Sequence, residues 1–189
     1  MITPERTLII LKPDAVQRGI TGKILNRFEE RGLRIAAIKM AMPTEEQLGL
    51  HYADDADWKK SVGKKTRENM LAKGISMAET DEQIGARIRS YNMGGLRQPV
   101  ITAVLEGYHV IEVVRQMIGG TEPRTAAPGT IRGDFSCDSY PKADIDKRVV
   151  RNLVHASGSQ KEAEREITLW FKKDELHDYP RRDWAIMHG

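Results

Sequence analysis

The chain has 189 residues, of which 40% are hydrophobic and 30% are charged, and its formal net charge is +3. These values are typical of a soluble globular protein with one core, and so mild a charge does not by itself imply nucleic-acid binding. No apolar run approaches membrane-spanning length, and the N-terminus lacks the basic and apolar regions of a secretory signal. The single cysteine, Cys137, excludes a disulfide within the chain and is compatible with a reducing cytoplasm.

The first half of the chain predicts alternating strands and short helices. A strand is expected at residues 5–11, a helix at residues 21–31 and a second strand at residues 34–41. Thr44 is expected to cap a further helix that runs to about residue 51, because Gln47 stands three residues later and completes a capping box.

The second half predicts two more strands among longer polar segments. Residues 57–97 are polar, with helical patches near 63–73 and 80–90. The elements expected after them are a strand at 100–106, a helix at 109–117, mostly loop at 119–147 with helical potential near 141–147, a short strand at 149–155 and a helix at 160–169. The order β-α-β-α-β-α-β-α is compatible with either a parallel α/β sheet or an α+β fold.

Three segments each present a side chain suited to phosphate chemistry. Lys12 follows a buried strand, and Arg132 lies between Gly129 and Gly133, which allow close backbone approach to a ligand. His155 stands among small residues, one short loop before a charged amphipathic stretch with Glu166. A histidine accepts a phosphoryl group when one ring nitrogen is free and a partner holds the other. Taken alone, such a histidine is more often a core or loop residue.

In order along the chain, these segments resemble the motifs of the nucleoside diphosphate kinase family. The matching residues are Lys12-Pro13-Asp14 with Val16, then Gly129-Thr130-Ile131-Arg132-Gly133-Asp134-Phe135, then Asn152, His155 and Ser157. Further matches lie at His51-Tyr52, residues 115–123 and residues 162–167. The resemblance covers nearly the whole chain except two extra stretches, near 59–97 and 138–148, and longer forms of this kind are similar to archaeal-type members.

The resemblance implies the fold, the oligomeric state and the cellular location of the protein. It implies an α+β fold in which helices cover a ferredoxin-like antiparallel sheet, with an inserted helical segment. Residues 1–189 are expected to form a single domain of this family. A homo-oligomer, hexameric by resemblance, is expected in the cytoplasm, with neither a membrane nor a specific nucleic acid as partner.

The resemblance also implies a reaction, in which the γ-phosphate of a nucleoside triphosphate passes to a nucleoside diphosphate. Transfer is expected to be ping-pong, through a phosphohistidine on His155. Glu166 matches the residue that holds the ring, and Ser157 matches one that supports this pair. The other interpretations are a solvated carboxylate for Glu166 and a helix cap for Ser157.

The remaining matched positions imply nucleotide binding. Four of them match phosphate-site residues, namely Lys12, Arg115, Thr121 and Arg132. Tyr52 matches a residue near the transferred phosphate, and Asn152 matches one that contacts the ribose together with Lys12. Each residue taken singly would be an ordinary polar or amphipathic surface residue. Mg²⁺ is expected to bridge the nucleotide phosphates, because it prefers phosphate oxygens and water to a full protein cage; Asp14 and Asp134 are expected to be structural.

Three departures from the family pattern leave alternatives open. Ala156 replaces a common glycine, which slows turnover if the position needs a positive φ and is harmless otherwise. Gly158 stands where many members have Asp. No Phe follows Tyr52 to stack on the base, so Trp58 is expected to replace it, or else to pack the 59–97 stretch onto the body.

Other functional classes stay open at this stage. The rival hypothesis is a non-catalytic nucleotide-binding or nucleic-acid-binding module on the same fold, although an RRM-like aromatic pattern is missing. Relay of phosphate from His155 to other proteins is a third possibility. The lysines at the start of the 59–97 stretch could guide nucleotides, contact a subunit or form a solvated face.

Overall fold

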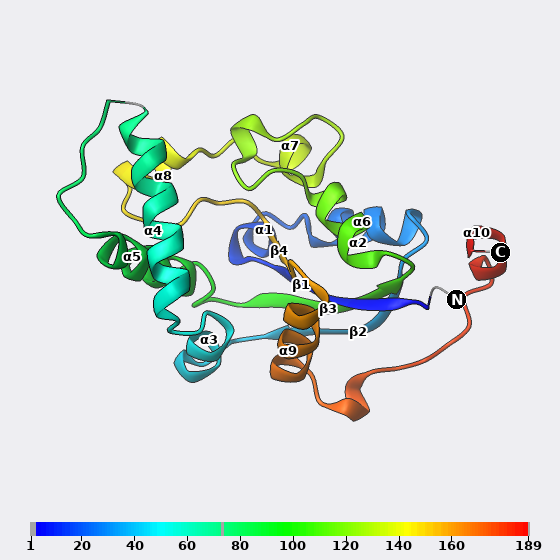
Figure 1. Ribbon diagram of the computed structural model, residues 1–189. Coiled ribbons are helices and arrows are strands. Elements are labelled where there is room, and N and C mark those ends of the chain that lie inside the picture. The colour runs from blue at the N-terminus through cyan, green and yellow to red at the C-terminus, as the bar shows by residue number, and fades with distance from the viewer. Residues whose placement is uncertain (1–2, 73, 189) are drawn as a thin grey trace.

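The computed structural model describes residues 3–72 and 74–188. Its centre is a four-stranded sheet with the strand order β2-β3-β1-β4 (Figure 1). The strands are β1 (Glu5–Leu11), β2 (Arg34–Ala41), β3 (Val100–Gly107) and β4 (Val154–Ala156). Every pairing is antiparallel, which confirms the α+β fold and excludes the parallel sheet.

The two central strands are apolar because helices cover both of their faces. In β1, Ile9 and Leu11 belong to the cluster packed with α2 (Thr21–Glu30) and α6 (Val110–Ile118). Leu8 and Ile10 point the other way, into the cluster formed with α3 (Glu45–His51) and α9 (Gln160–Trp170). Side chains alternate along a strand, so one continuous apolar run supplies both cores.

The expected inserted segment is a helical hairpin, α4 (Ala56–Leu71) and α5 (Asp81–Gly94), which lies beside the sheet (Figure 1). The two helices approach closely at glycines. A Cβ on Gly63 would collide with the carbonyl oxygen of Asp81, and a Cβ on Gly85 with that of Lys59. The first helix starts earlier than the expected patch near 63, because the Asp55 side chain caps it by accepting from the Trp58 amide at 2.6 Å.

Two predictions were wrong in extent. The fourth strand was expected at 149–155 but covers only Val154–Ala156, because Leu153 has a φ of 68° and interrupts the extended backbone. The stretch 119–147, expected to be mostly loop with helical potential near 141–147, contains three short helices, and the last of them lies where that potential was expected. They are η1 (Pro123–Thr125), α7 (Ile131–Phe135) and α8 (Tyr140–Ile145).

The remaining elements lie near the ends of the chain: α1 (Pro13–Gln17), η2 (Lys173–Glu175) and α10 (Trp184–His188). The Thr44 cap is confirmed, since its side chain accepts from the Gln47 amide at 3.1 Å. The Gln47 side chain does not complete the expected capping box, because it donates instead to the Leu169 carbonyl at 3.3 Å. Within the described residues, no helix combines the length and apolar character needed to cross a membrane.

Candidate active site

His155 lies in the middle of β4, opposite Ile10 of the neighbouring strand. Its Nε2 is 3.0 Å from Glu166 Oε2 and 3.1 Å from Oε1. A ring nitrogen facing a carboxylate carries the proton, so the other nitrogen, Nδ1, holds the free lone pair. The side chain is 18% exposed, which leaves the imidazole partly open to a ligand. This geometry leaves Nδ1 as the nitrogen that is available to a ligand.

Glu166, on α9, is buried, and its carboxylate accepts hydrogen bonds from two donors. Besides the His155 ring, the Ser157 hydroxyl donates to Glu166 Oε2 at 2.7 Å. Burial alone would raise the pKa of Glu166, but the hydrogen bond and charge of His155 dominate and hold that pKa below its usual range. Ser157 is not a helix cap, since Ser159 caps α9. The structure thus brings His155, Glu166 and Ser157 together.

His51 is a further member of this cluster that sequence reasoning did not single out. Its Nδ1 accepts from the Trp170 indole N–H at 3.3 Å and lies 3.6 Å from Glu166 Oε1. Its ring meets the His155 ring edge-on, with centroids 4.7 Å apart. Burial, aided by His155, lowers the pKa of His51 to about 3, so the ring is neutral at physiological pH. The sequence feature that could have identified His51 is its position three residues after Leu48, on the buried face of α3.

Tyr52 follows directly and lies against this cluster. Its ring centroid is 4.6 Å from that of His51. Burial, with smaller contributions from Glu166 and Glu162, raises the pKa of Tyr52, so its hydroxyl stays protonated and can donate. The Tyr52 carbonyl accepts from Arg89 Nε at 2.6 Å, which connects this position to α5.

Lys12, Asn152 and Thr121 form a chain of contacts just before the start of β4. Lys12 Nζ donates to Asn152 Oδ1 at 2.7 Å, and Asn152 Nδ2 donates to the Thr121 carbonyl at 3.0 Å. Burial lowers the pKa of Lys12 to about 8, while Asp14 opposes this shift. Asp14 also accepts from the Leu153 amide at 3.0 Å and so supports the turn before β4.

Arg132 connects the segments around these residues by hydrogen bonds to their backbone. Its Nε donates to the Asn152 carbonyl at 3.1 Å, Nη1 to the Gly119 carbonyl at 2.8 Å and Nη2 to the Val154 carbonyl at 2.6 Å. Burial lowers the pKa of Arg132 to about 10, which still leaves the guanidinium protonated at neutral pH. The residue therefore places a fixed positive charge beside Lys12 and Asn152.

Arg115 and Gly158 lie next to each other at the end of β4. A Cβ on Gly158 would be 3.5 Å from Arg115 Nη1 and only 2.7 Å from Glu162 Oε2. The Gly158 amide also donates to Glu162 Oε2 at 2.6 Å. A side chain at this position would displace Glu162, which gives a packing reason for this departure from the family pattern.

The other two departures from the family pattern are at Ala156 and Trp58. Ala156 is paired with Ile9 in β4 and does not have a positive φ, so its methyl group causes no backbone strain. Trp58 lies in the first turn of α4 with 36% of its surface exposed. Among the described residues, no hydrogen bond or ring contact joins its side chain to the other predicted site residues.

One group of side chains in the described ranges has metal-ligand geometry. Donor atoms of His51, His155 and Glu166 lie within 4.8 Å of one another. Two nitrogens and one carboxylate in a buried position do not suit Mg²⁺, which prefers oxygen and water. Asp14 and Asp134 are engaged elsewhere, the latter with the Gly129 amide at 2.8 Å and with Arg27 at 2.6 Å.

Comparisons with known proteins agree with this geometry. The family model described as nucleoside diphosphate kinase matches residues 5–84 and 87–176. A nucleoside diphosphate kinase of Pyrobaculum aerophilum is 43% identical, covering 91% of this chain and 97% of the relative. A crystal structure of an NDP kinase from that organism superposes with a TM-score of 0.88 at 41% identity, covering 93% of this chain and all of the other.

A second solved structure was determined with reaction components. The nucleoside-diphosphate kinase from Borrelia burgdorferi, a transition-state mimic with bound vanadate and ADP, has a TM-score of 0.79 and 34% identity. The alignment covers 97% of this chain and 96% of that one. A halophilic nucleoside diphosphate kinase from Halobacterium salinarum in complex with CDP has a TM-score of 0.71 at 32% identity, covering 99% and 100% of the two chains.

Proposed function

The chain belongs to the nucleoside diphosphate kinase family, and from that premise we propose that His155 Nδ1 carries the phosphoryl group between nucleotides. The enzyme transfers the γ-phosphate of a nucleoside triphosphate to a nucleoside diphosphate by a ping-pong mechanism. The observation that supports this role for His155 is the contact of its Nε2 with the buried carboxylate of Glu166, because it leaves Nδ1 free.

In the first half-reaction, the Nδ1 lone pair forms an N–P bond and the bond from phosphorus to the bridging oxygen breaks. The electron pair leaves with the nucleoside diphosphate. Positive charge that develops on the imidazole is stabilised by Glu166, while the proton stays on Nε2. The second half-reaction reverses these steps with another diphosphate, so one site serves both nucleotides.

The cationic residues neutralise the phosphates. We assign this role to Lys12, Arg115 and Arg132, with Thr121 and Tyr52 as hydroxyl donors. Lys12 and Asn152 are proposed to contact the ribose hydroxyls, since their side chains are already joined at 2.7 Å. Trp58 is proposed to stack on the base. Hydrogen bonds to ribose and phosphate, together with stacking that accepts any base, explain tolerance of different bases.

The family implies a divalent metal, which we assign as Mg²⁺ carried on the nucleotide phosphates. The side chains in the described ranges that could hold an ion are nitrogen-rich and buried, which supports delivery of Mg²⁺ with the substrate. When bound, the ion neutralises phosphate charge.

We also propose a homo-oligomer, hexameric by resemblance, built from single-domain chains in the cytoplasm. The edge strand β2 supports self-association, because Ile38 is 49% exposed and Met40 is 64% exposed. Exposed apolar side chains on a sheet edge favour pairing with another chain. Light scattering on the purified protein would test this, and a monomer would refute it.

The test of the function is a nucleotide-exchange assay on wild type and His155→Ala. The variant is expected to bind nucleotides and to lose exchange entirely. His177→Ala is a matched control, because the contact of His177 with Ala36 uses its backbone amide. Equal exchange by wild type and His155→Ala would refute the assignment. Binding without exchange in the wild type would favour the rival, a non-catalytic nucleotide-binding module.

A further inference from the structure

The extra stretch at residues 138–148 is tied to the phosphate side of the site through Asp138. Its carbonyl accepts from the Arg124 amide at 3.1 Å, and its carboxylate accepts from the Arg151 amide at 2.7 Å. Arg148 forms a bidentate pair with the same carboxylate at 2.6 and 3.1 Å. The stretch therefore connects the loop after Thr121 with the residues just before Asn152.

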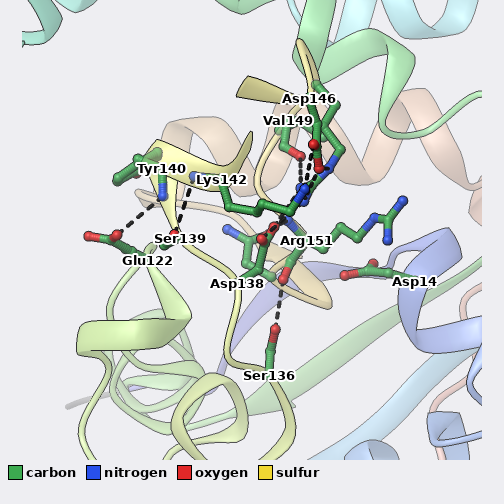
Figure 2. Close-up of polar contacts among 12 residues, drawn as sticks. Asp14, Glu122, Ser136, Asp138, Ser139, Tyr140, Lys142, Asp146, Val149 and Arg151 are labelled. Atoms are coloured by element: carbon green, nitrogen blue, oxygen red, sulfur yellow. Dashed lines mark hydrogen bonds and ion pairs between the residues drawn. The ribbon is translucent and has the colours of Figure 1, made fainter. Parts of the chain in front are cut away.

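These contacts place the first residue of α8 beside the loop that carries Thr121. The Tyr140 amide donates to Glu122 Oε1 at 3.2 Å, as Figure 2 shows, and Glu122 directly follows Thr121. Ser139 caps the helix by accepting from the Lys142 amide at 3.4 Å. Tyr140 is thus fixed by its backbone, while 42% of its residue surface remains exposed.

The hydroxyl of Tyr140 is directed to the phosphate side of the site. It lies beside the Thr121 side chain, and it is close enough to the Arg132 guanidinium for the two to interact electrostatically. Burial of the hydroxyl and the charge of Glu122 raise the pKa of Tyr140 above its usual value. The hydroxyl therefore keeps its proton at neutral pH and can donate it to an anion.

Arg132 alone offers limited hydrogen bonding to a nucleotide. A guanidinium has five N–H groups, and three atoms of this one already donate to the carbonyls of Gly119, Val154 and Asn152. Arg132 is therefore mainly a fixed charge, and neighbouring hydroxyls can add hydrogen bonds to phosphate oxygens. Thr121 and Tyr140 supply such hydroxyls among the described residues.

We propose that Tyr140 is a nucleotide-binding residue supplied by the extra stretch, and that its hydroxyl donates to a phosphate oxygen beside Thr121 and Arg132. This deepens the proposed function and rests on it for the position of the nucleotide. Tyr140 adds affinity for phosphate without taking part in the bond-making at His155.

The test is direct binding of ADP with Mg²⁺ by wild type, Tyr140→Phe and Tyr179→Phe. The phenylalanine keeps the ring and the backbone bond to Glu122, and removes only the hydroxyl. Tyr179→Phe is the matched control, because its hydroxyl donates to the Ile35 carbonyl at 3.1 Å, in the C-terminal segment. One hydrogen bond to a charged group is worth roughly tenfold in affinity, so Tyr140→Phe should weaken ADP binding about tenfold.

Two further readouts separate binding from folding and from catalysis. Adenosine, which has no phosphate, should bind equally to wild type and Tyr140→Phe. In the exchange assay, Tyr140→Phe should raise KM with kcat within about twofold of wild type. ADP affinity within about twofold of wild type would overturn the proposal. If the wild type binds ADP but does not exchange phosphate, the proposed function is refuted, and the ADP affinities of wild type and Tyr140→Phe still decide the role of Tyr140. If the wild type does not bind ADP, the proposed function and the role of Tyr140 are both refuted.

Discussion

His155 and Arg132 lie in the same site, but their surroundings differ in kind. His155 is held by side chains, since Glu166 is bonded to its ring and to Ser157, and His51 and Trp170 are packed behind them. Arg132 is held by backbone, through three carbonyls that belong to two segments, around Gly119 and at 152–154. One end of the site orients an imidazole ring, and the other end fixes positive charge.

This difference separates two functions. At the nucleophile end, side chains fix a tautomer, so a substitution there should act mainly on kcat. At the phosphate end, positive charges and donors are directed at a polyanion, so a substitution there should act mainly on nucleotide affinity. Substitutions at each end of the site test whether these two functions are separate.

Glu166→Gln tests the nucleophile end. The amide keeps the shape of the side chain but loses the negative charge that stabilises the imidazole as phosphorus is transferred. Loss of such an orienting partner typically costs 10- to 100-fold, and we expect kcat to fall about 100-fold with little change in ADP affinity. The control is Glu164→Gln, an exposed carboxylate on the same helix. An unchanged kcat would show that Glu166 does not orient the ring.

His51→Gln tests the buried histidine through the pH dependence of stability. The folded-state pKa of His51 is about 3, below its ordinary value of 6.5, so unfolding takes up a proton between these values. Its contribution to stability is therefore complete above pH 6.5 and is lost as pH falls. Between pH 6.5 and 5 the wild type should lose about 1.5 kcal/mol of unfolding free energy more than the variant does. Parallel pH profiles from chemical denaturation would contradict a neutral buried His51.

Lys12→Met tests the phosphate end. The long apolar side chain keeps the packing and removes the charge, and we expect ADP to bind about tenfold more weakly below pH 8. The pKa of Lys12 in the free protein is about 8, so wild-type affinity should decline above that pH and the affinity of the variant should not. Lys60→Met, at an exposed position on α4, is the control. Calorimetry that finds no proton uptake on ADP binding near pH 8 would contradict a Lys12–phosphate contact.

Trp58→Ala tests whether Trp58 stacks on the nucleotide base. Trp58 belongs neither to the nucleophile end nor to the phosphate end of the site. Base stacking on an aromatic ring is worth at least about fivefold in affinity, so KM should rise about fivefold for all nucleotides, and Trp58→Phe should restore it. If KM is the same in wild type and Trp58→Ala, Trp58 serves instead to pack the hairpin.

The sequence indicated the central part of the fold because β1 and β3 are apolar on both faces. It did not indicate the length of β4, since the left-handed backbone of Leu153 depends on contacts with Lys12 and Asp14 far away in the chain. The family motifs pointed to His155, Glu166 and Ser157, and their contacts are present.

The contacts that His51 and Tyr140 make in the site could not be predicted, for different reasons. The side chain of His51 points at Glu166 only after α3 and α9 have packed together, and periodicity alone indicates a buried face without naming its neighbours. Tyr140 lies in a stretch outside the motifs, where position is set by ion pairs around Asp138 and not by hydrophobic pattern.

The most direct test of the account is to incubate the protein with γ-labelled ATP and Mg²⁺ without acceptor, and to measure label on wild type and His155→Ala. We expect acid-labile, base-stable label on Nδ1 of His155 in the wild type, its loss when a nucleoside diphosphate is added, and no label on the variant. Absence of label on a wild type that binds nucleotide, or equal label on His155→Ala, would contradict the phosphohistidine mechanism.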